Sequence, residues 1–316
     1  MQNRSLGRTG LAIAPLVFGG NVFGWTADKA TSFALLDQFV DAGFNAIDTA
    51  DVYSAWAPGN AGGESETIIG EWMKRSKIDR DRVVIVTKVG SDLGDNRKGL
   101  SARWIAEAVE ASLTRLQTDH VDLYLSHWPD AGTPYEETLG AYDRLLKAGK
   151  VRAIGASNLD SAQLRAALDV SAATGLPRYD VLQPEYNLYD RDGFDGPLRN
   201  LCLSEEIGVI TYYSLASGFL TGKYRSHKDI EGKTRGQAAA KYLDGRGMRI
   251  LGALDAVADA TGSTPATIAL AWLMARKGVT APIASATTPE QLTALTKAAR
   301  LALSDEMIRM LSDASE

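Results

Sequence analysis

Cysteine, histidine and long apolar runs are all scarce in this chain of 316 residues. The single cysteine, Cys202, excludes an intrachain disulfide, and we expect it to pack inside a helix as a small apolar residue. No apolar stretch approaches the roughly twenty residues that a membrane-spanning helix needs. No signal peptide is visible at the N-terminus. We therefore expect a cytoplasmic protein that does not enter a membrane.

Positive charge is in slight deficit. The chain holds 34 lysine and arginine residues against 39 aspartate and glutamate residues, for a formal net charge of −5. A nucleic-acid-binding protein normally carries a clustered basic face, whereas the basic runs here are short. We therefore expect no nucleic-acid partner, and the sequence leaves the existence of a homo-oligomer open.

Apolar residues make up 45% of the chain, enough for a large core. They gather in short runs that alternate with stretches of helical period. Eight runs are candidate strands: residues 16–18, 44–47, 83–86, 121–125, 151–154, 181–182, 209–213 and 282–284. Their consecutive apolar residues indicate strands buried on both faces, and the intervening stretches are long enough for crossover helices.

Eight strand–helix units in one chain favour a closed barrel. We predict an α/β fold, a (β/α)8 TIM barrel that forms a single domain over residues 1–316. An open doubly wound sheet is the alternative, but the dinucleotide-binding fingerprint GxGxxG is missing. Residues 224–247 are polar and should form a long loop over the barrel mouth, whereas residues 304–316 should form an extra amphipathic helix outside the barrel.

Polar side chains follow several predicted strands directly. Asp48 ends the second strand, Lys88 ends the third and His127 follows the fourth, while Tyr53 comes shortly after Asp48. Active sites of β/α barrels form at the carboxyl ends of the strands, so these four side chains should converge on one rim. Further polar residues follow the fifth, sixth and seventh strands: Ser157, Asn158, Gln183, Tyr213 and Ser214.

The first four residues suit proton transfer to a carbonyl oxygen. A phenol has an ordinary pKa of about 10 and is a poor acid at neutral pH, but a neighbouring ammonium stabilises the phenolate and lowers that pKa. Asp48 would hold Lys88 in place, and His127 would donate a hydrogen bond to the substrate oxygen. A hydride must then come from a bound cofactor, since no side chain supplies one.

Each of these residues alone has an ordinary structural explanation. Asp48 could cap a turn, Tyr53 could be a half-buried packing residue, and His127 could be a hydrogen-bonded structural histidine. Lys88 is more suggestive, because lysine is rarely buried without a partner. The coincidence of all four at matching strand ends favours the catalytic interpretation.

Six segments resemble the signature segments of the aldo-keto reductases, in the family's order. They read AIDTADVY (46–53), IVTKVG (85–90), DLYLSHWPD (122–130), GASN (155–158), QPEYNL (183–188) and YSLASGFLTGKY (213–224). The resemblance covers nearly the whole chain and implies a bacterial-type NAD(P)H-dependent oxidoreductase on a TIM barrel. It also implies that Tyr53 is the general acid–base, adjusted by Lys88 and Asp48, and that His127 orients the substrate carbonyl.

The resemblance also implies where the cofactor lies. Ser157, Asn158 and Gln183 would hydrogen-bond the nicotinamide carboxamide, and Tyr213 would stack on its ring. The other residues expected to bind the cofactor, chiefly around its pyrophosphate and adenosine, are Gly20, Ser214, Leu215, Ser217, Gly218, Lys223, Ser285, Thr287 and Gln291. A helix that starts near residue 288 should favour an anionic group there.

The choice between the two nicotinamide cofactors is less clear in the sequence. Family members that prefer NADPH often carry Arg or Lys in the last of these segments, where it holds the 2′-phosphate. Here residues 284–288 read ASATT, and no basic residue follows before Lys297. We expect NADP(H), the family's usual cofactor, and keep relaxed or NAD(H)-leaning selectivity as an alternative.

Three tryptophans lie on loops after the first, second and fourth predicted strands. Aromatic residues in such positions commonly line an apolar pocket. We expect Trp25, Trp56 and Trp128 to line the substrate pocket, although each could equally be structural. The expected substrate is an aldehyde, a ketone or the corresponding secondary alcohol.

Two other functions stay open at this point. One is a cofactor-binding regulatory or redox-sensing subunit with slow turnover, as in channel-associated members of the family. The other is a metal-dependent hydrolase on the same fold. Such a hydrolase needs clustered histidine and carboxylate ligands at strand ends, where only His127 stands, so we expect no metal site.

Overall fold

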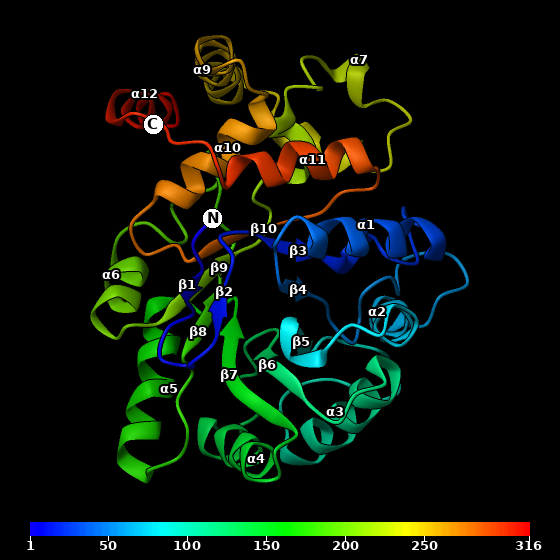
Figure 1. The fold of residues 1–316 in the computed structure, drawn as a ribbon. Helices are drawn as coiled ribbons and strands as arrows, with labels where there is room; N and C mark the ends of the chain where they lie inside the picture. Colours follow the sequence, from blue (N-terminus) through cyan, green and yellow to red (C-terminus); the bar gives the residue numbers. More distant parts are fainter.

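Eight parallel strands form a closed barrel in the computed structural model, which describes residues 1–316 (Figure 1). In chain order the barrel strands are β3 (Val17–Gly19), β4 (Ala46–Asp48), β5 (Val84–Val89), β6 (Val121–Ser126), β7 (Val151–Ser157), β8 (Val181–Gln183), β9 (Gly208–Thr211) and β10 (Ala281–Ala284). Strand β10 pairs with β3 and closes the barrel. The predicted TIM barrel is confirmed, and each predicted strand overlaps one of these eight.

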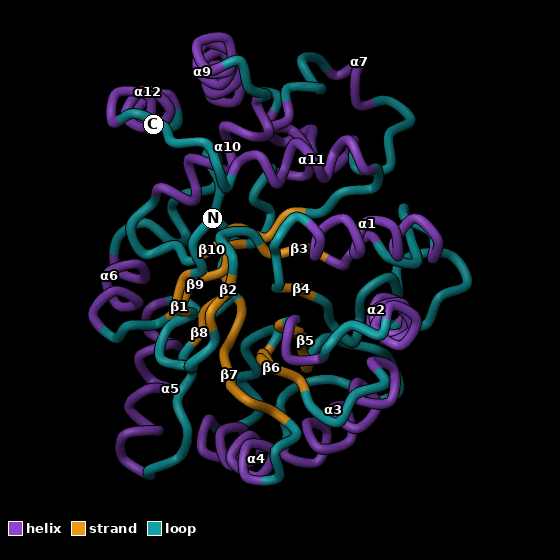
Figure 2. Tube along the Cα trace, in the orientation of Figure 1, coloured by secondary structure: helices purple, strands orange, loops and turns teal.

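A ring of helices surrounds the barrel (Figure 2). One helix follows each barrel strand in turn: α1 (Lys29–Asp41), α2 (Glu64–Ser76), α3 (Ala102–Leu116), α4 (Tyr135–Lys147), α5 (Ser161–Thr174), α6 (Pro197–Ser204), α10 (Pro265–Ala275) and α11 (Pro289–Ala298). Side chains at their starts accept backbone N–H groups, as Asp28, Ser101 and Asp160 do. No helix combines the length and the apolar character that crossing a lipid bilayer requires.

Two further helices lie outside this ring. Helix α12 (Asp305–Ala314) is the predicted extra helix, and it packs against α9 (Gly245–Thr261), which the sequence analysis did not anticipate. Figure 1 shows both at the outer edge of the molecule, near the C-terminus. The segment expected to be one long loop also contains short helical turns, α7 (His227–Ile230), α8 (Gly236–Ala239) and a 3-10 turn over Ala240–Tyr242. A capping box at Ser226 and the cap at Asp244 start these helices.

A short antiparallel hairpin precedes the barrel and was also not predicted. Its strands are β1 (Arg4–Ser5) and β2 (Ala12–Ile13), and Leu6 and Ile13 are buried in one cluster with the apolar barrel interior. At Gly7, which has φ +58°, a Cβ atom would lie 2.3 Å from the backbone oxygen of Asp180, so only glycine fits. The hairpin therefore closes the end of the barrel at which β8 and β9 begin.

Alternate residues of each strand point into the barrel. The inward residues of the lower and middle layers are small or branched: Val17, Ala46, Val84, Val86, Leu123, Leu125, Ala153, Val181, Ile210, Ala281 and Ile283. Continuing the same alternation toward the carboxyl ends reaches a layer of glycine and polar residues: Gly19, Asp48, Lys88, His127, Ser157, Gln183, Tyr212 and Ser285. The barrel interior thus changes from apolar to polar at the rim where active sites form.

Candidate active site

Lys88 is fully buried at the centre of the polar rim. Its Nζ donates hydrogen bonds to Asp48 Oδ2 at 2.8 Å, to the backbone oxygen of Thr49 at 2.7 Å and to Tyr53 Oη at 2.8 Å. An ammonium has three protons, so each one has an acceptor. Burial lowers the pKa of Lys88, and the carboxylate of Asp48 opposes that effect.

Asp48 joins three strands of the barrel. Its Oδ2 also accepts the Tyr53 hydroxyl at 3.1 Å, and its Oδ1 accepts Gln183 Nε2 at 2.8 Å. The second, third and sixth barrel strands therefore contribute to one buried network, as their positions at strand ends predict. Gln183 joins this network by donating one hydrogen of its side-chain amide to Asp48.

The environment of Tyr53 differs from the expectation in one respect. Burial raises the pKa of Tyr53 well above its ordinary value, and the charge of Asp48 and the hydrogen bond to it act in the same direction. The expected lowering of that pKa is therefore wrong for this arrangement of side chains. The phenol keeps its proton at neutral pH, and the Lys88 hydrogen bond stabilises the oxygen once the proton leaves.

His127 lies beside Tyr53, with the two ring centroids 6.1 Å apart. Burial and the nearby Lys88 charge hold the pKa of His127 well below its ordinary value, so the imidazole is neutral. Its Nδ1 lies 2.9 Å from Ser91 Oγ, the only hydrogen bond of that hydroxyl. We assign the Ser91 hydroxyl as the donor, which places the ring hydrogen on Nε2. The sequence analysis did not identify Ser91.

Two of the three tryptophans predicted for the substrate pocket lie against these two rings, and the third packs on one of those tryptophans. Trp56 lies 6.0 Å from Tyr53 and 5.6 Å from Trp25, and Trp128 stacks on His127 at 5.8 Å, all between ring centroids. Trp56 is 48% exposed and Trp128 is 49% exposed, although both are large apolar residues. The structure thus brings an aromatic surface next to the rings of Tyr53 and His127.

The residues expected at the nicotinamide carboxamide are hydrogen-bonded among themselves. Ser157 Oγ donates to the backbone oxygen of Gln183 at 2.7 Å, and Asn158 Nδ2 donates to that of His127 at 2.8 Å. Asn158 Oδ1 accepts the hydroxyl of Tyr212 at 2.6 Å. Tyr212 was not predicted, although its place in the inward alternation of β9 could have indicated it.

The segment after β9 carries an unusual backbone. Tyr213, Ala216 and Ser217 have φ angles of 51°, 48° and 55°, and Gly218 follows at 90°. Positive φ is costly for residues other than glycine, and such positions concentrate at functional sites. The side chain of Tyr213 is also 52% exposed, which leaves its ring free to contact a ligand.

Two cations lie close to this segment without a carboxylate partner. Lys223 folds across Gly218, where a Cβ atom would meet its Cε and Nζ at 3.2 Å. Arg235, which the sequence analysis did not single out, lies over the ring of Trp25 at 5.4 Å from the centroid. Its Nη2 is buried with no hydrogen-bond partner, and burial lowers its pKa. An unpaired buried guanidinium is costly, and an anion at this place would relieve that cost.

Some of the predicted cofactor residues turn their side chains elsewhere. The hydroxyl of Ser214 is buried and donates to the backbone oxygen of Thr211 at 3.0 Å. Gly20 is buried against β4, where a Cβ atom would lie 2.9 Å from the backbone oxygen of Asp48. Leu215 is partly buried and packs against the core. The side chains of Ser214 and Leu215 are therefore engaged within the protein, and position 20 has no room for a side chain.

The segment expected at the adenosine is compact. Ser285 Oγ donates to Asn21 Oδ1 at 2.7 Å. Gln291 Oε1 accepts the backbone N–H of Thr287 at 2.9 Å, at the start of α11. Both Thr287 and Gln291 are accessible at the surface, and no basic side chain is hydrogen-bonded to either of them.

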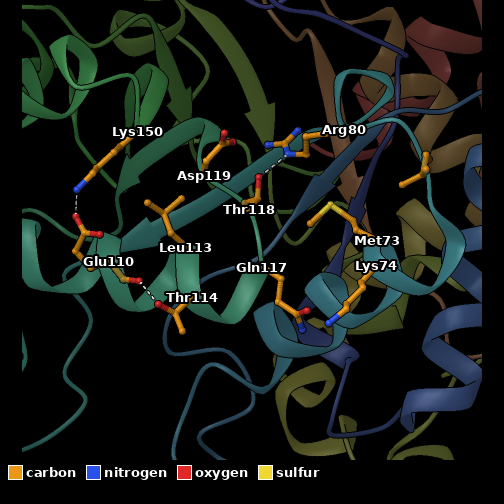
Figure 3. Close-up of a pocket in the computed structure, with 11 residues that line it drawn as sticks. Met73, Lys74, Arg80, Glu110, Leu113, Thr114, Gln117, Thr118, Asp119 and Lys150 are labelled. Atoms are coloured by element: carbon orange, nitrogen blue, oxygen red, sulfur yellow. Dashed lines mark hydrogen bonds and ion pairs between the residues drawn. The ribbon is translucent and has the colours of Figure 1, made fainter.

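A groove elsewhere on the molecule does not belong to this site. It lies on the outer surface and is lined by residues of α2 and α3 and of the turns that precede β5, β6 and β7 (Figure 3). The side chains of Glu110 and Lys150 pair across it, and Arg80 Nε donates to Thr118 Oγ1. None of the predicted site residues lines the groove.

Comparison with known proteins agrees with the sequence pattern. The family model described as "Aldo/keto reductase family" matches residues 15–316. The chain belongs to the aldo/keto reductase family. It is therefore an oxidoreductase, as the family resemblance predicted.

Among its aldo/keto reductase relatives are two proteins of Bacillus subtilis. "Uncharacterized oxidoreductase YrpG" is 34% identical, over 99% of this chain and 95% of that protein. "Aldo-keto reductase YhdN" is 33% identical, over 97% of this chain and 91% of that protein. A rice protein named "Probable voltage-gated potassium channel subunit beta" is 35% identical, over 92% of this chain and 89% of that protein.

Proposed function

We propose that the chain transfers a hydride between a nicotinamide cofactor and an aldehyde or ketone, or the corresponding secondary alcohol, with Tyr53 as the general acid–base. One observation carries this proposal. Tyr53 Oη lies 2.8 Å from the buried Lys88 ammonium and 3.1 Å from Asp48 Oδ2, on the same rim as His127. A phenol held between a cation and a carboxylate can give up and recover a proton with little rearrangement.

The residues divide the work of carbonyl reduction. The Nε2–H of neutral His127 donates to the substrate oxygen and fixes its orientation next to Tyr53. A nicotinamide cofactor, when bound, supplies the hydride that no side chain can supply. Tyr53 gives its proton to the substrate oxygen as negative charge builds there, and Lys88 stabilises the phenolate that remains. Asp48 keeps Lys88 charged and in place, and solvent later returns a proton to Tyr53.

The cofactor site is proposed from features of the chain itself. The exposed ring of Tyr213 offers a surface for the nicotinamide, and Asn158 lies on the same rim, hydrogen-bonded to the neighbouring Tyr212. The backbone turn at Ser217 and Gly218 and the unpaired cations Lys223 and Arg235 suit a pyrophosphate. The main support for this placement is that both cations lack a carboxylate partner within the protein, whereas a pyrophosphate is negatively charged.

The residues expected at the adenosine bear on which nicotinamide cofactor the chain prefers. We expect NADP(H), as is usual in the family, with relaxed selectivity that also admits NAD(H). The support for relaxed selectivity is that Ser285, Thr287 and Gln291 offer hydroxyl and amide groups but no cation for a 2′-phosphate.

The pocket favours an apolar carbonyl substrate. Trp56 lies against Tyr53, Trp128 stacks on His127 and Trp25 packs on Trp56, and the half-exposed rings of Trp56 and Trp128 would be covered by a bound substrate. Burying such rings against an apolar group is favourable.

A binding titration tests the proposal first. Purified protein is titrated with NADPH and with NADH while intrinsic tryptophan fluorescence is followed, beside a Tyr213→Ala control. Saturable quenching that weakens in the control supports the cofactor site, and a panel of carbonyls and alcohols then tests turnover. Quenching by neither cofactor would overturn the proposed function.

A second candidate rests on the name of the rice relative. The chain would then be a cofactor-binding regulatory or redox-sensing subunit with slow turnover. Turnover far below that of ordinary enzymes, together with capture of a partner protein, would favour this function over the first.

A further inference from the structure

Asp51 is buried close to the proposed catalytic residues, yet no side chain donates a hydrogen bond to either of its carboxylate oxygens. Its side chain is almost completely buried, and both Oδ atoms are enclosed by the protein. Its backbone nitrogen lies 3.4 Å from the backbone oxygen of Lys88. A buried carboxylate without a donor is strongly unfavourable, so this position needs an explanation.

Asp51 faces the outer side of the barrel wall, behind Lys88. The titratable groups around it come from five elements: Glu66 of α2, Lys88 of β5, Arg115 of α3, Tyr124 of β6 and Tyr142 of α4. Thr87 and Tyr124 lie at outward positions of their strands, opposite in alternation to Lys88. Asp51 is thus separated from the substrate pocket by the strand that carries Lys88.

Two donors on the neighbouring α3 and β5 bind Glu66 and not Asp51. Arg115 Nε donates to Glu66 Oε2 at 2.7 Å, and Thr87 Oγ1 donates to Glu66 Oε1 at 2.6 Å. The hydroxyl of Tyr124 is also buried without a partner. Burial and the charge of Glu66 raise the pKa of Asp51 to about 8. The carboxyl is therefore mostly neutral at pH 7 and becomes charged as the pH rises above 8.

The charge on Asp51 is felt by Lys88. An ionised Asp51 raises the pKa of Lys88, opposing the effect of burial. Asp48 supports Lys88 from inside the barrel through a direct ion pair, whereas Asp51 acts through space from the outside. Asp51 thus supplies negative charge only at alkaline pH, where Lys88 is closest to losing its proton.

We propose that Asp51 is a positioning residue for the reaction: from the outer side of the barrel wall it keeps Lys88 charged at alkaline pH and so sustains the Tyr53 phenolate. It touches neither substrate nor cofactor. The proposal rests on the proposed function of Tyr53 and Lys88. It concerns alcohol oxidation most directly, because Tyr53 must then act as a base while Lys88 is still charged.

The test is the pH profile of alcohol oxidation for the full chain and for Asp51→Asn, which changes charge and little else. Below pH 7 both proteins should have the same kcat, because Asp51 is neutral there. Above pH 8 the variant should lose activity earlier, with its alkaline limb shifted down by about one pH unit and KM unchanged. A loss of kcat that is the same at every pH would show a merely structural role and overturn the proposal.

Two further variants serve as controls. Asp51→Glu restores a carboxyl and should recover the alkaline limb. Asp122→Asn changes another buried aspartate, one that is hydrogen-bonded to Arg80 at 2.7 Å, so any loss that it causes should not depend on pH. If Asp122→Asn shifted the alkaline limb as Asp51→Asn does, the effect would not be specific to Asp51 and the proposal would fail.

Infrared titration tests the charge of Asp51 without any turnover. The carbonyl stretching band of a protonated carboxyl should disappear in the wild-type protein as the pH passes through about 8 and should be absent from Asp51→Asn. If this band does not titrate near pH 8 in the wild-type protein, the proposal is overturned, even if Tyr53 and Lys88 prove essential for turnover. A wild-type protein that shows the titration but reduces no carbonyl would instead contradict the proposed function alone.

Discussion

Replacement of Lys88 and Asp48, singly and together, separates the proposed catalytic role of this ion pair from its effect on stability. Lys88 is 0% exposed and Asp48 is 1% exposed, and their ion pair measures 2.8 Å. Lys88→Met leaves the Asp48 carboxylate buried, with only the Tyr53 hydroxyl and Gln183 Nε2 as donors. Removing one partner of a buried ion pair costs about 3–5 kcal/mol in the free energy of unfolding.

Asp48→Asn should cost a similar amount, because it leaves a buried ammonium without its counter-charge. The double variant removes both charges, so only neutral hydrogen bonds remain to be lost, at about 1 kcal/mol each. We therefore expect the double variant to be more stable than either single variant. All three should lose at least about a hundredfold in kcat for carbonyl reduction, since none retains the charged pair.

Urea unfolding at pH 7, followed by tryptophan fluorescence, measures stability, and steady-state reduction at saturating cofactor measures activity. The double variant should recover stability relative to the single variants, but it should not recover kcat. The reasoning is refuted if Lys88→Met is as stable as the wild-type protein, or if the double variant is less stable than both single variants.

Three further predictions concern neighbouring residues. Ser91→Ala removes the donor to His127 Nδ1 and frees the other tautomer, so kcat/KM for carbonyl reduction should fall about tenfold; an unchanged value would contradict the assignment of the Nε2 hydrogen. Arg235→Ala should raise the Kd for NADPH in the fluorescence titration, most strongly at low salt, and a salt-independent loss would argue against a charge contact. Thr287→Arg should tighten NADPH binding and leave NADH binding unchanged, measured as the ratio of the two Kd values; an equal effect on both would place the 2′-phosphate elsewhere.

Much of the site follows from the period of two in the strands. Asp48, Lys88 and Gln183 stand two residues beyond inward apolar positions, so a barrel prediction alone brings them to one rim. Tyr53 does not, because it lies on a turn held by Ser54, whose φ is 73° and whose Oγ donates to the backbone oxygen of Phe23 at 2.6 Å. Its place on the rim was expected only from its closeness to Asp48 in the sequence, and the family resemblance supported it.

The remaining residues depend on contacts between distant segments. Arg235 reaches Trp25 only because the segment after β9 folds back over the rim, and no local pattern encodes that contact. Ser91 lies in a loop whose sequence carries no periodic signal. Helix α9 was missed because its polar, glycine-containing start resembles the loop before it, although Asp244 caps it. Tyr212 is the exception, since the inward alternation of β9 could have identified it.

The most direct test of the central claim is the comparison of Tyr53→Phe with the wild-type protein. The variant loses one hydroxyl, and with it the group that Lys88 and Asp48 hold at 2.8 Å and 3.1 Å. With cofactor binding first shown to be unchanged by fluorescence titration, kcat for carbonyl reduction should fall by about 10²–10⁴-fold. A variant that binds cofactor normally and retains most of its kcat would contradict the assignment of Tyr53 as the general acid–base.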